Sequence, residues 1–297
     1  MTRHLLEVDD LTPDELAEVL ALGQERAAPR VLEGQGAALL FEKPSARTRH
    51  STEMAVVQLG GHPIYVRPDE VGIDTRETAE DVARTLSQFH AAICARVFHH
   101  SVLERMAGAG SVPVVNLLSD EAHPLQAIAD LLTVDATVGL EDRTVAWIGD
   151  FSNVARSLAL ASAMVGLGVR VACPDGFGPS DADLARVRAL GGHIEVSDDP
   201  AAAVKGVEAV STDAWYSMGQ EDEAAERRPV FLPYRVDAAL MAEAAPDAVF
   251  LHCLPAHRGE EVTDDVLDGP ASQVWPQAAN RLHAARAALA WLLGVRP

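Results

Sequence analysis

The chain has 297 residues, of which 48% are hydrophobic, and its 44 acidic and 24 basic side chains give a formal net charge of −20. A chain of this length and composition can bury two hydrophobic cores. The negative charge disfavours binding to nucleic acid and to anionic membranes, because both repel an acidic surface. An anionic substrate therefore requires a local cluster of arginines.

The three cysteines, Cys94, Cys173 and Cys253, lie in apolar runs and lack the paired spacing of a zinc site. Their odd number also disfavours a disulfide framework, so a reducing, cytoplasmic environment is expected. Charged residues interrupt every apolar run near the N-terminus, and no run reaches the length of about 18 residues that a membrane span needs. We expect neither a signal peptide nor a membrane span.

Strand-like and helix-like segments alternate along the first half of the chain. Strands are predicted at 36–43, 62–68, 91–98 and 112–118, and helices at 47–61, 77–89, 101–110 and 123–139. The alternation resumes with strands at 143–150, 169–174, 193–198, 206–214 and 248–255, and with helices at 153–168 and 181–192. This rhythm is typical of parallel sheets flanked by helices.

We therefore predict an α/β fold with two domains, residues 1–133 and 134–276, each a parallel β-sheet flanked by helices. Residues 277–297 have the pattern of one amphipathic helix, which is expected to pack back on the first domain.

Ligands of parallel sheets bind beyond the carboxyl ends of the strands, so polar residues directly after apolar runs are candidate site residues. FEKPSARTRHS places Ser45, Arg47, Thr48 and Arg49 where a strand passes into a helix. The free N–H groups of a helix start favour a phosphate. Arg47 and Arg49 cannot face the same side of a helix, so at most one is expected to reach the ligand.

Other polar residues follow later strands. Arg96 ends an apolar run, where a charge requires a partner. His123 and Gln126 share one face of a helix start and can hold a carbonyl group, although such residues also suit an ordinary helix cap. The turn IGDFSN lacks the glycines that a pyrophosphate requires after Gly149, which argues against a nicotinamide enzyme.

Two segments near the end of the second domain carry further candidates. Asp213 follows a strand in STDAWYSMGQEDE, where a carboxylate suits a cationic amine. Cys253 follows a strand in FLHCLPAHRGEEV. A free cysteine at a strand end is usually a small buried hydrophobe, so Cys253 by itself predicts no chemistry.

Taken in order, five segments resemble the aspartate and ornithine carbamoyltransferase family. FEKPSARTRHS resembles its carbamoyl-phosphate signature and HPLQAIAD its histidine–glutamine motif, whereas DAWYSMGQE, HCLPAHRGEEV and NRLH are similar to segments of the ornithine branch. The resemblance extends from Leu40 to Leu293. It implies two α/β domains, no metal or organic cofactor, and a homotrimer whose active sites are shared between subunits.

The resemblance also implies a reaction in which carbamoyl phosphate and the side-chain amine of L-ornithine give citrulline and phosphate. Carbamoyl phosphate would be bound by Ser45, Arg47, Thr48, Arg96, His123, Gln126, Cys253, Leu254 and Arg281, and ornithine by Asn153, Asp213, Ser217 and Met218. Catalysis would involve Arg47, Arg96, His123, Cys253 and Arg281. Cys253 would then lie beside the reacting amine.

Two positions depart from the family pattern. Ala46 stands where the family usually has threonine, and Gly72 stands where the ornithine branch commonly presents a glutamine to a neighbouring subunit. Alternatives therefore stay open: transfer to N-acylated ornithine, putrescine or aspartate, a non-catalytic binding relative, or a nucleotide-binding enzyme. Asp213 disfavours the second carboxylate of aspartate, and putrescine lacks the carboxylate that Asn153 would serve.

Overall fold

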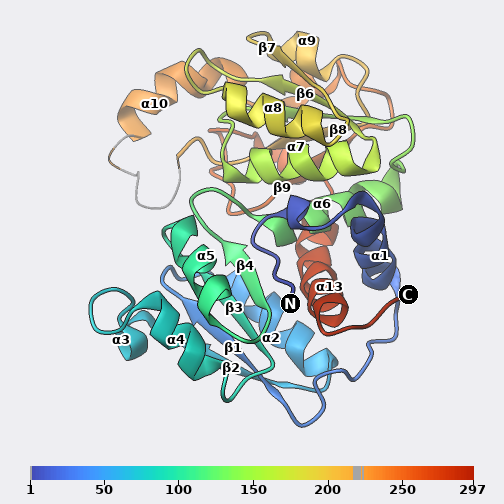
Figure 1. Cartoon of the computed structure of the whole chain (residues 1–297). Coiled ribbons are helices and arrows are strands. Elements are labelled where there is room, and N and C mark those ends of the chain that lie inside the picture. Colours follow the sequence, from blue (N-terminus) through green and yellow to red (C-terminus); the bar gives the residue numbers. More distant parts are fainter. Residues whose placement is uncertain (1, 217–221, 223) are drawn as a thin grey trace. The chain divides into compact units, whose positions relative to one another are not determined.

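The computed structural model describes residues 2–216, 222 and 224–297. The chain divides into two compact units, Met1–Ala129 with Ala279–Pro297, and Asp130–Ala278. Each unit contains one parallel sheet flanked by helices, which confirms the predicted α/β class (Figure 1). The limits of the units fall inside two helices, α6 (Pro124–Thr137) and α13 (Val274–Leu292).

The first unit is built on a four-stranded sheet with the order β2-β1-β3-β4. Its strands are β1 (Gly36–Phe41), β2 (His62–Val66), β3 (Ala92–Arg96) and β4 (Val114–Leu118). Its helices are η1 (Val8–Asp10), α1 (Pro13–Gln24), α2 (Ala46–Gln58), α3 (Pro68–Val71), α4 (Ala79–Leu86) and α5 (His100–Ala109), with parts of α6 and α13. The central strands β1 and β3 are almost entirely buried, which explains their uninterrupted apolar sequences.

The C-terminal helix returns to the first unit, as predicted, although it begins at Val274 instead of residue 277. It packs against α1, where the indole N–H of Trp291 donates to Glu18 at 2.7 Å. The guanidinium of Arg286 donates to the carbonyls of Gly23 and Glu25 near the end of α1. These bonds bring residues more than 250 positions apart in sequence into one core.

The second unit is built on a five-stranded sheet with the order β7-β6-β5-β8-β9. Its strands are β5 (Thr144–Ile148), β6 (Gly168–Ala172), β7 (Ile194–Ser197), β8 (Ala209–Thr212) and β9 (Val249–His252). Its helices are α7 (Asn153–Val165), α8 (Asp181–Ala189), α9 (Pro200–Val204), α10 (Ala224–Phe231), η3 (Leu232–Tyr234), α11 (Ala238–Met241) and α12 (Asp264–Leu267). Helices α7 and α8 lie side by side on one face of the sheet (Figure 1).

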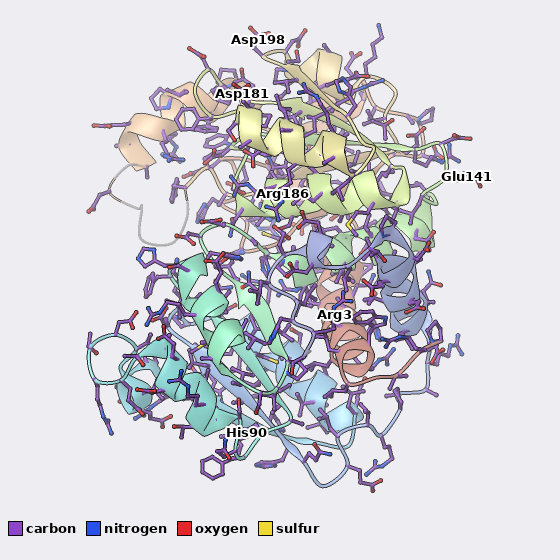
Figure 2. All side chains as sticks on the ribbon, in the orientation of Figure 1. Arg3, His90, Glu141, Asp181, Arg186 and Asp198 are labelled. Atoms are coloured by element: carbon purple, nitrogen blue, oxygen red, sulfur yellow. The ribbon has the colours of Figure 1, made fainter. Side chains whose placement is uncertain are left out.

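The sequence did not predict the four short helices α9 to α12, because segments of four to eight residues are too short to show helical periodicity. None of the described helices combines the length and the apolar composition that crossing a membrane requires. Exposed acidic side chains, among them Glu141, Asp181 and Asp198, carry part of the net charge (Figure 2).

Candidate active site

The first group of candidate residues lies where the strand order of the first unit reverses. The chain proceeds from β1 to β2 on one side and then to β3 and β4 on the other, and ligands of parallel sheets bind at the carboxyl ends of such a strand pair. Phe41 and Arg96, the last residues of β1 and β3, are register partners. Ser45 follows β1 as the N-cap of α2, where it accepts from the N–H of Thr48. The Ser45 hydroxyl also donates to Oγ1 of Thr48 at 3.1 Å.

Arg281 joins this group from the C-terminal helix. Its guanidinium donates to Oε1 of Gln126 at 2.5 Å and to Oγ1 of Thr48 at 3.3 Å. Thr48, Gln126 and Arg281 are each at most 5% exposed. Side chains from α2, α6 and α13 therefore meet in one buried polar cluster, which brings together three of the residues expected to bind carbamoyl phosphate: Thr48, Gln126 and Arg281.

The charges of this cluster favour a small anion. Arg96 and His123 are as buried as Arg281. Burial and then the guanidinium groups of Arg281 and Arg96 hold the pKa of His123 well below its ordinary value of 6.5. The imidazole is therefore neutral at pH 7 and can donate a ring N–H without adding charge. Burial, followed by the charge of Arg96, also lowers the pKa of Lys43.

The two arginines at the start of α2 have different surroundings. Arg49 donates from Nε to Glu53 at 2.8 Å, and its guanidinium lies 3.9 Å from the ring centroid of Tyr65. Arg47 is partly buried, two positions earlier on the helix. Ala46, the first residue of α2, is exposed. Arg49 is thus engaged with Glu53 and Tyr65.

The second group lies where the strand order of the second unit reverses, between β5 and β8. The hydroxyl of Thr212 donates to the carbonyl of Ile148 at 2.6 Å and joins the ends of these strands. Asn153 begins α7 shortly after β5, and its Oδ1 accepts from the N–H of Val154 at 3.0 Å. Asp213 directly follows β8. Both residues occupy the region in which the rule for parallel sheets places a ligand.

Asp213 also contacts Cys253, which follows β9. The thiol of Cys253 donates to Oδ1 of Asp213 at 3.0 Å. Burial raises the pKa of Asp213, and the nearby His252 and the bond from Cys253 oppose that rise. A cationic partner would stabilise the ionised form of this buried carboxylate, because an ion pair compensates part of the free-energy cost of burial. The two residues thus form a candidate binding site for an amine.

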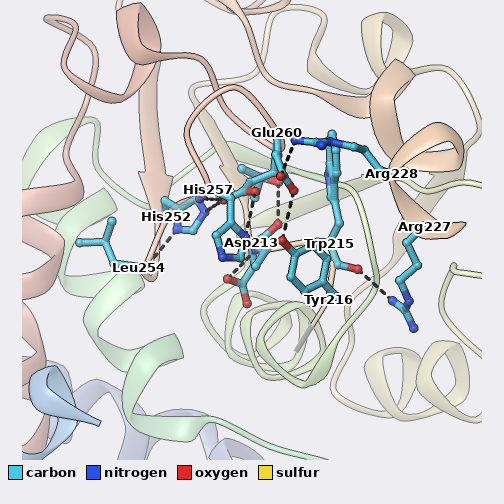
Figure 3. A network of polar contacts seen from close by, with 12 residues as sticks. Asp213, Trp215, Tyr216, Arg227, Arg228, His252, Leu254, His257 and Glu260 are labelled. Carbon is cyan, nitrogen blue, oxygen red and sulfur yellow. Dashed lines mark hydrogen bonds and ion pairs between the residues drawn. The ribbon is translucent and has the colours of Figure 1, made fainter. Parts of the chain in front are cut away.

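A buried pair that the sequence did not predict, His252 with Glu261, holds the chain after β9; its histidine is labelled in Figure 3. His252 and Glu261 have fully buried side chains, and Nε2 of His252 lies 3.1 Å from Oε1 of Glu261. Nδ1 of His252 accepts from the N–H of Leu254 at 2.9 Å, so the ring proton belongs to Nε2. Leu254 has φ of 60°, a conformation that a branched residue rarely adopts, and this bond supports it. The only signal in the sequence was the charge in HRGEEV directly after an apolar run.

Donor atoms of Asp213, His252 and Cys253 lie within 4.8 Å of one another, a spacing that would suit a metal ion. Both ring nitrogens of His252 and the thiol of Cys253 are engaged by protein groups instead. Cys253 and Leu254 belong to the second unit, whereas the other residues expected to bind carbamoyl phosphate belong to the first. Ser217 and Met218, expected to bind ornithine, lie outside the described residues.

Comparisons with known proteins show the family of this chain. Residues 3–136 match the carbamoyl-P binding domain of aspartate/ornithine carbamoyltransferase, and residues 141–292 match its Asp/Orn binding domain. The chain is 49% identical to an ornithine carbamoyltransferase of Acidothermus cellulolyticus, over 99% of this chain and 97% of the relative. It is 47% identical to one of Mycolicibacterium paratuberculosis, over 98% of both chains.

Solved structures agree as well. The ornithine carbamoyltransferase of Pyrococcus furiosus superposes with a TM-score of 0.94 at 43% identity, covering 99% of this chain and 98% of the other. That of Thermus thermophilus superposes with a TM-score of 0.90 at 44% identity, covering 99% of both chains. This chain therefore belongs to the aspartate/ornithine carbamoyltransferase family.

Proposed function

We propose that this chain transfers the carbamoyl group of carbamoyl phosphate to the side-chain amine of L-ornithine, giving citrulline and phosphate. The observation that carries the proposal is the buried set of Arg281, Arg96, neutral His123 and Gln126 beside the helix start at Ser45. We assign carbamoyl phosphate to residues 1–133 with the C-terminal helix 277–297, and the amino acid to residues 134–276. The names of the relatives support ornithine as the amine.

The binding residues would act on charge that develops during the reaction. Ser45, Arg47 and Thr48 hold the phosphate at the start of α2, where the N–H groups of a first helical turn and the helix dipole favour an anion. Arg96, His123 and Gln126 donate to the carbamoyl group, and Arg281 completes the cluster. Such donors stabilise the transition state most, and loss of one typically costs about 3 kcal/mol.

The transfer itself requires no covalent enzyme intermediate. The amine nitrogen forms a bond to the carbonyl carbon, the bond from that carbon to the phosphate oxygen breaks, and the amine loses a proton. A side-chain ammonium has a pKa of about 10.4, so holding the amine neutral near pH 7.4 costs about 4 kcal/mol. The rate of transfer is therefore expected to rise with pH from neutral to alkaline conditions.

The chemistry of the second unit selects among amines. Asp213 would pair with the α-ammonium group of ornithine, Cys253 would lie beside its side-chain amine, and Asn153 would bind its carboxylate. The second carboxylate of aspartate would meet the carboxylate of Asp213, which disfavours that substrate. Putrescine has no carboxylate for Asn153. Ser217 and Met218 remain part of the proposed ornithine site.

We further propose a cytoplasmic homotrimer with shared active sites. Met54 and Val57 lie three positions apart on α2 and are each 47% exposed, and Ile64 on the edge strand β2 is 42% exposed. Exposed apolar side chains of this size suit a contact with another copy. The segment 69–78 would reach the neighbouring site. Arg105 pairs with Asp74 of this segment and with Glu80 of α4, which directly follows it.

A substrate panel tests the proposed function. The purified protein with carbamoyl phosphate should form citrulline from L-ornithine, with little or no transfer to N-acetylornithine, putrescine or aspartate. A metal chelator should leave the rate unchanged, as the resemblance implies. Transfer only to another amine, or no transfer at all, would reject the proposal.

Two arginines of α2 provide a matched pair of variants. Arg47→Gln should weaken carbamoyl phosphate strongly, because it removes a guanidinium contact to a phosphate. Arg49→Gln, on the same helix but paired with Glu53, should leave that affinity nearly unchanged. Asp213→Asn should weaken ornithine while carbamoyl phosphate binds as before. If Arg47→Gln and Arg49→Gln lowered the affinity for carbamoyl phosphate equally, the assignment of the phosphate site would be contradicted.

A further inference from the structure

Arg227 of α10 connects the chain segments that follow β5 and β8. Its Nη1 donates to Oδ2 of Asp150 at 2.9 Å and to the carbonyl of Trp215 at 2.9 Å (Figure 3 shows the second bond). The side chains of Arg227 and Asp150 are 15% and 26% exposed. Since β5 and β8 flank the point of strand reversal, this one guanidinium spans the place where the amino acid is proposed to bind.

A short path leads from each end of this bridge to a proposed ornithine-binding residue. The carbonyl of Asp150 accepts from the N–H of Ser152 at 2.8 Å, and Ser152 is the N-cap of α7, which begins with Asn153. On the other side, Trp215 stands two residues after Asp213 and is fully buried. A shift of either end therefore moves Asn153 or Asp213.

Aromatic packing holds the guanidinium in place. The Cζ of Arg227 lies 5.1 Å from the ring centroid of Phe177. The rings of Phe177 and Phe231 lie 4.7 Å apart, and those of Phe231 and Trp215 lie 5.9 Å apart. Phe231 belongs to α10, as Arg227 does, so the helix that supplies the cation is anchored against the segments that follow β6 and β8. A guanidinium can stack on a ring and donate two bonds at once, which an ammonium does less well.

The next residue offers a natural comparison. Arg228 donates to Oε1 of Glu260 at 2.6 Å, but its side chain is 60% exposed. Surface ion pairs contribute little, because water and salt screen them. Arg227 and Arg228 thus share a helix and a charge but differ in burial and in what they connect.

We propose that Arg227, with Asp150 as its partner, is a positioning residue for the amino-acid substrate. Its bridge sets the separation of Asn153 and Asp213, so that the carboxylate and the α-ammonium group of one molecule fit both. The inference rests on the proposed function. It assigns a role to Asp150, the aspartate of IGDFSN, which is not among the proposed ornithine-binding residues.

Steady-state kinetics of Arg227→Gln, Asp150→Asn and Arg228→Gln test the proposal. Arg227→Gln should raise the KM for ornithine by about tenfold or more, whereas the dissociation constant of carbamoyl phosphate changes by less than about twofold. Asp150→Asn should give the same pattern. Arg227→Lys should recover part of the affinity, because it keeps the charge opposite Asp150. Arg228→Gln should behave like the wild type.

The double variant Arg227→Gln with Asp150→Asn should be no worse than the poorer single variant, because both remove one bridge. An unchanged KM for ornithine, equal losses for both substrates, or an equal effect of Arg228→Gln would overturn the proposal. If Arg227→Gln does not fold, the nearly isosteric Asp150→Asn decides by the same criteria. The wild type is measured in parallel, so that failure of this proposal can be told apart from failure of the proposed function. If the wild type transfers the carbamoyl group to another amine, that amine replaces ornithine in every comparison.

Discussion

Ala46 is the residue at which the phosphate site departs most clearly from the family pattern. It is exposed at the first position of α2, between Ser45 and Arg47. A threonine hydroxyl there could donate one charge-assisted bond to a phosphate oxygen. Ala46→Thr is expected to strengthen the binding of carbamoyl phosphate by about 1 to 2 kcal/mol, which lowers its dissociation constant about 5- to 30-fold.

Titration calorimetry and urea unfolding of both forms check this prediction. Because Ala46 is exposed, the added methyl and hydroxyl groups meet no core, so the unfolding midpoint should hardly change. Weaker binding at an unchanged midpoint would mean that the phosphate is held by a different set of donors.

His123 makes the stability of the folded chain depend on pH. Its folded-state pKa is held well below 6.5, so below that pH the unfolded chain binds a proton that the folded chain does not. Stability therefore rises with pH up to about 6.5 and is flat above it, as far as this residue is concerned. At about pH 5.5 the loss reaches at most about 1.4 kcal/mol, the value for a folded state that binds no proton there.

Urea unfolding of the wild type and of His123→Asn between about pH 5.5 and 8 measures this contribution. The variant should lose less stability toward acid, by up to about that amount, whatever its stability at pH 8. Parallel curves for the two proteins would show that His123 titrates normally. Comparing slopes removes the contributions of the other histidines, which both proteins share.

Among the elements, the loop after β9 depends on one buried carboxylate. Glu261 accepts from the backbone N–H of His257 at 2.6 Å and from the ring of His252. Glu261→Ala leaves the buried ring of His252 and the partly buried N–H of His257 without that acceptor and should destabilise the chain by about 2 to 5 kcal/mol. It should also weaken ornithine, because His252 holds the backbone between Cys253 and Leu254.

The neighbouring Glu260 provides the control for this prediction. It accepts from the exposed Arg228 and, at 3.3 Å, from the hydroxyl of Tyr216. Glu260→Ala should therefore cost only about 1 kcal/mol. Chemical unfolding of both variants distinguishes them, and equal costs would contradict the importance of the buried pair.

For the whole molecule, the proposed homotrimer predicts the mass of the assembly and the recovery of activity when two inactive variants are mixed. Sedimentation should give three times the 31.6 kDa of one chain. Chains with Arg47→Gln, mixed with chains whose segment 69–78 is replaced by glycine and serine, should regain activity that neither has alone. The intact segment of the first variant would then complete the intact phosphate site of the second.

Two results would contradict the shared site. A fully active monomer at assay concentration would show that one chain suffices. Mixed trimers without recovered activity would show that segment 69–78 serves its own chain.

The sequence by itself determined much of this protein. Uninterrupted apolar runs identified central strands such as β1 and β3, because strands covered on both faces need no polar alternation. Their positions after strands made Arg96, His123 and Asp213 candidate site residues, because parallel sheets bind ligands at that edge. The order of the motifs indicated the family, which the comparisons confirmed.

Only the tertiary structure decided which of these residues meet. Arg281 contacts Thr48 and Gln126 across 233 and 155 positions of sequence, and Arg227 contacts Asp150 across 77. Such contacts depend on the order of the strands and on helices that return to a sheet. The local periodicity of the sequence predicts neither of these. The burial of a residue also depends on the tertiary structure. His123 is neutral because packing buries it and brings Arg281 and Arg96 close to it.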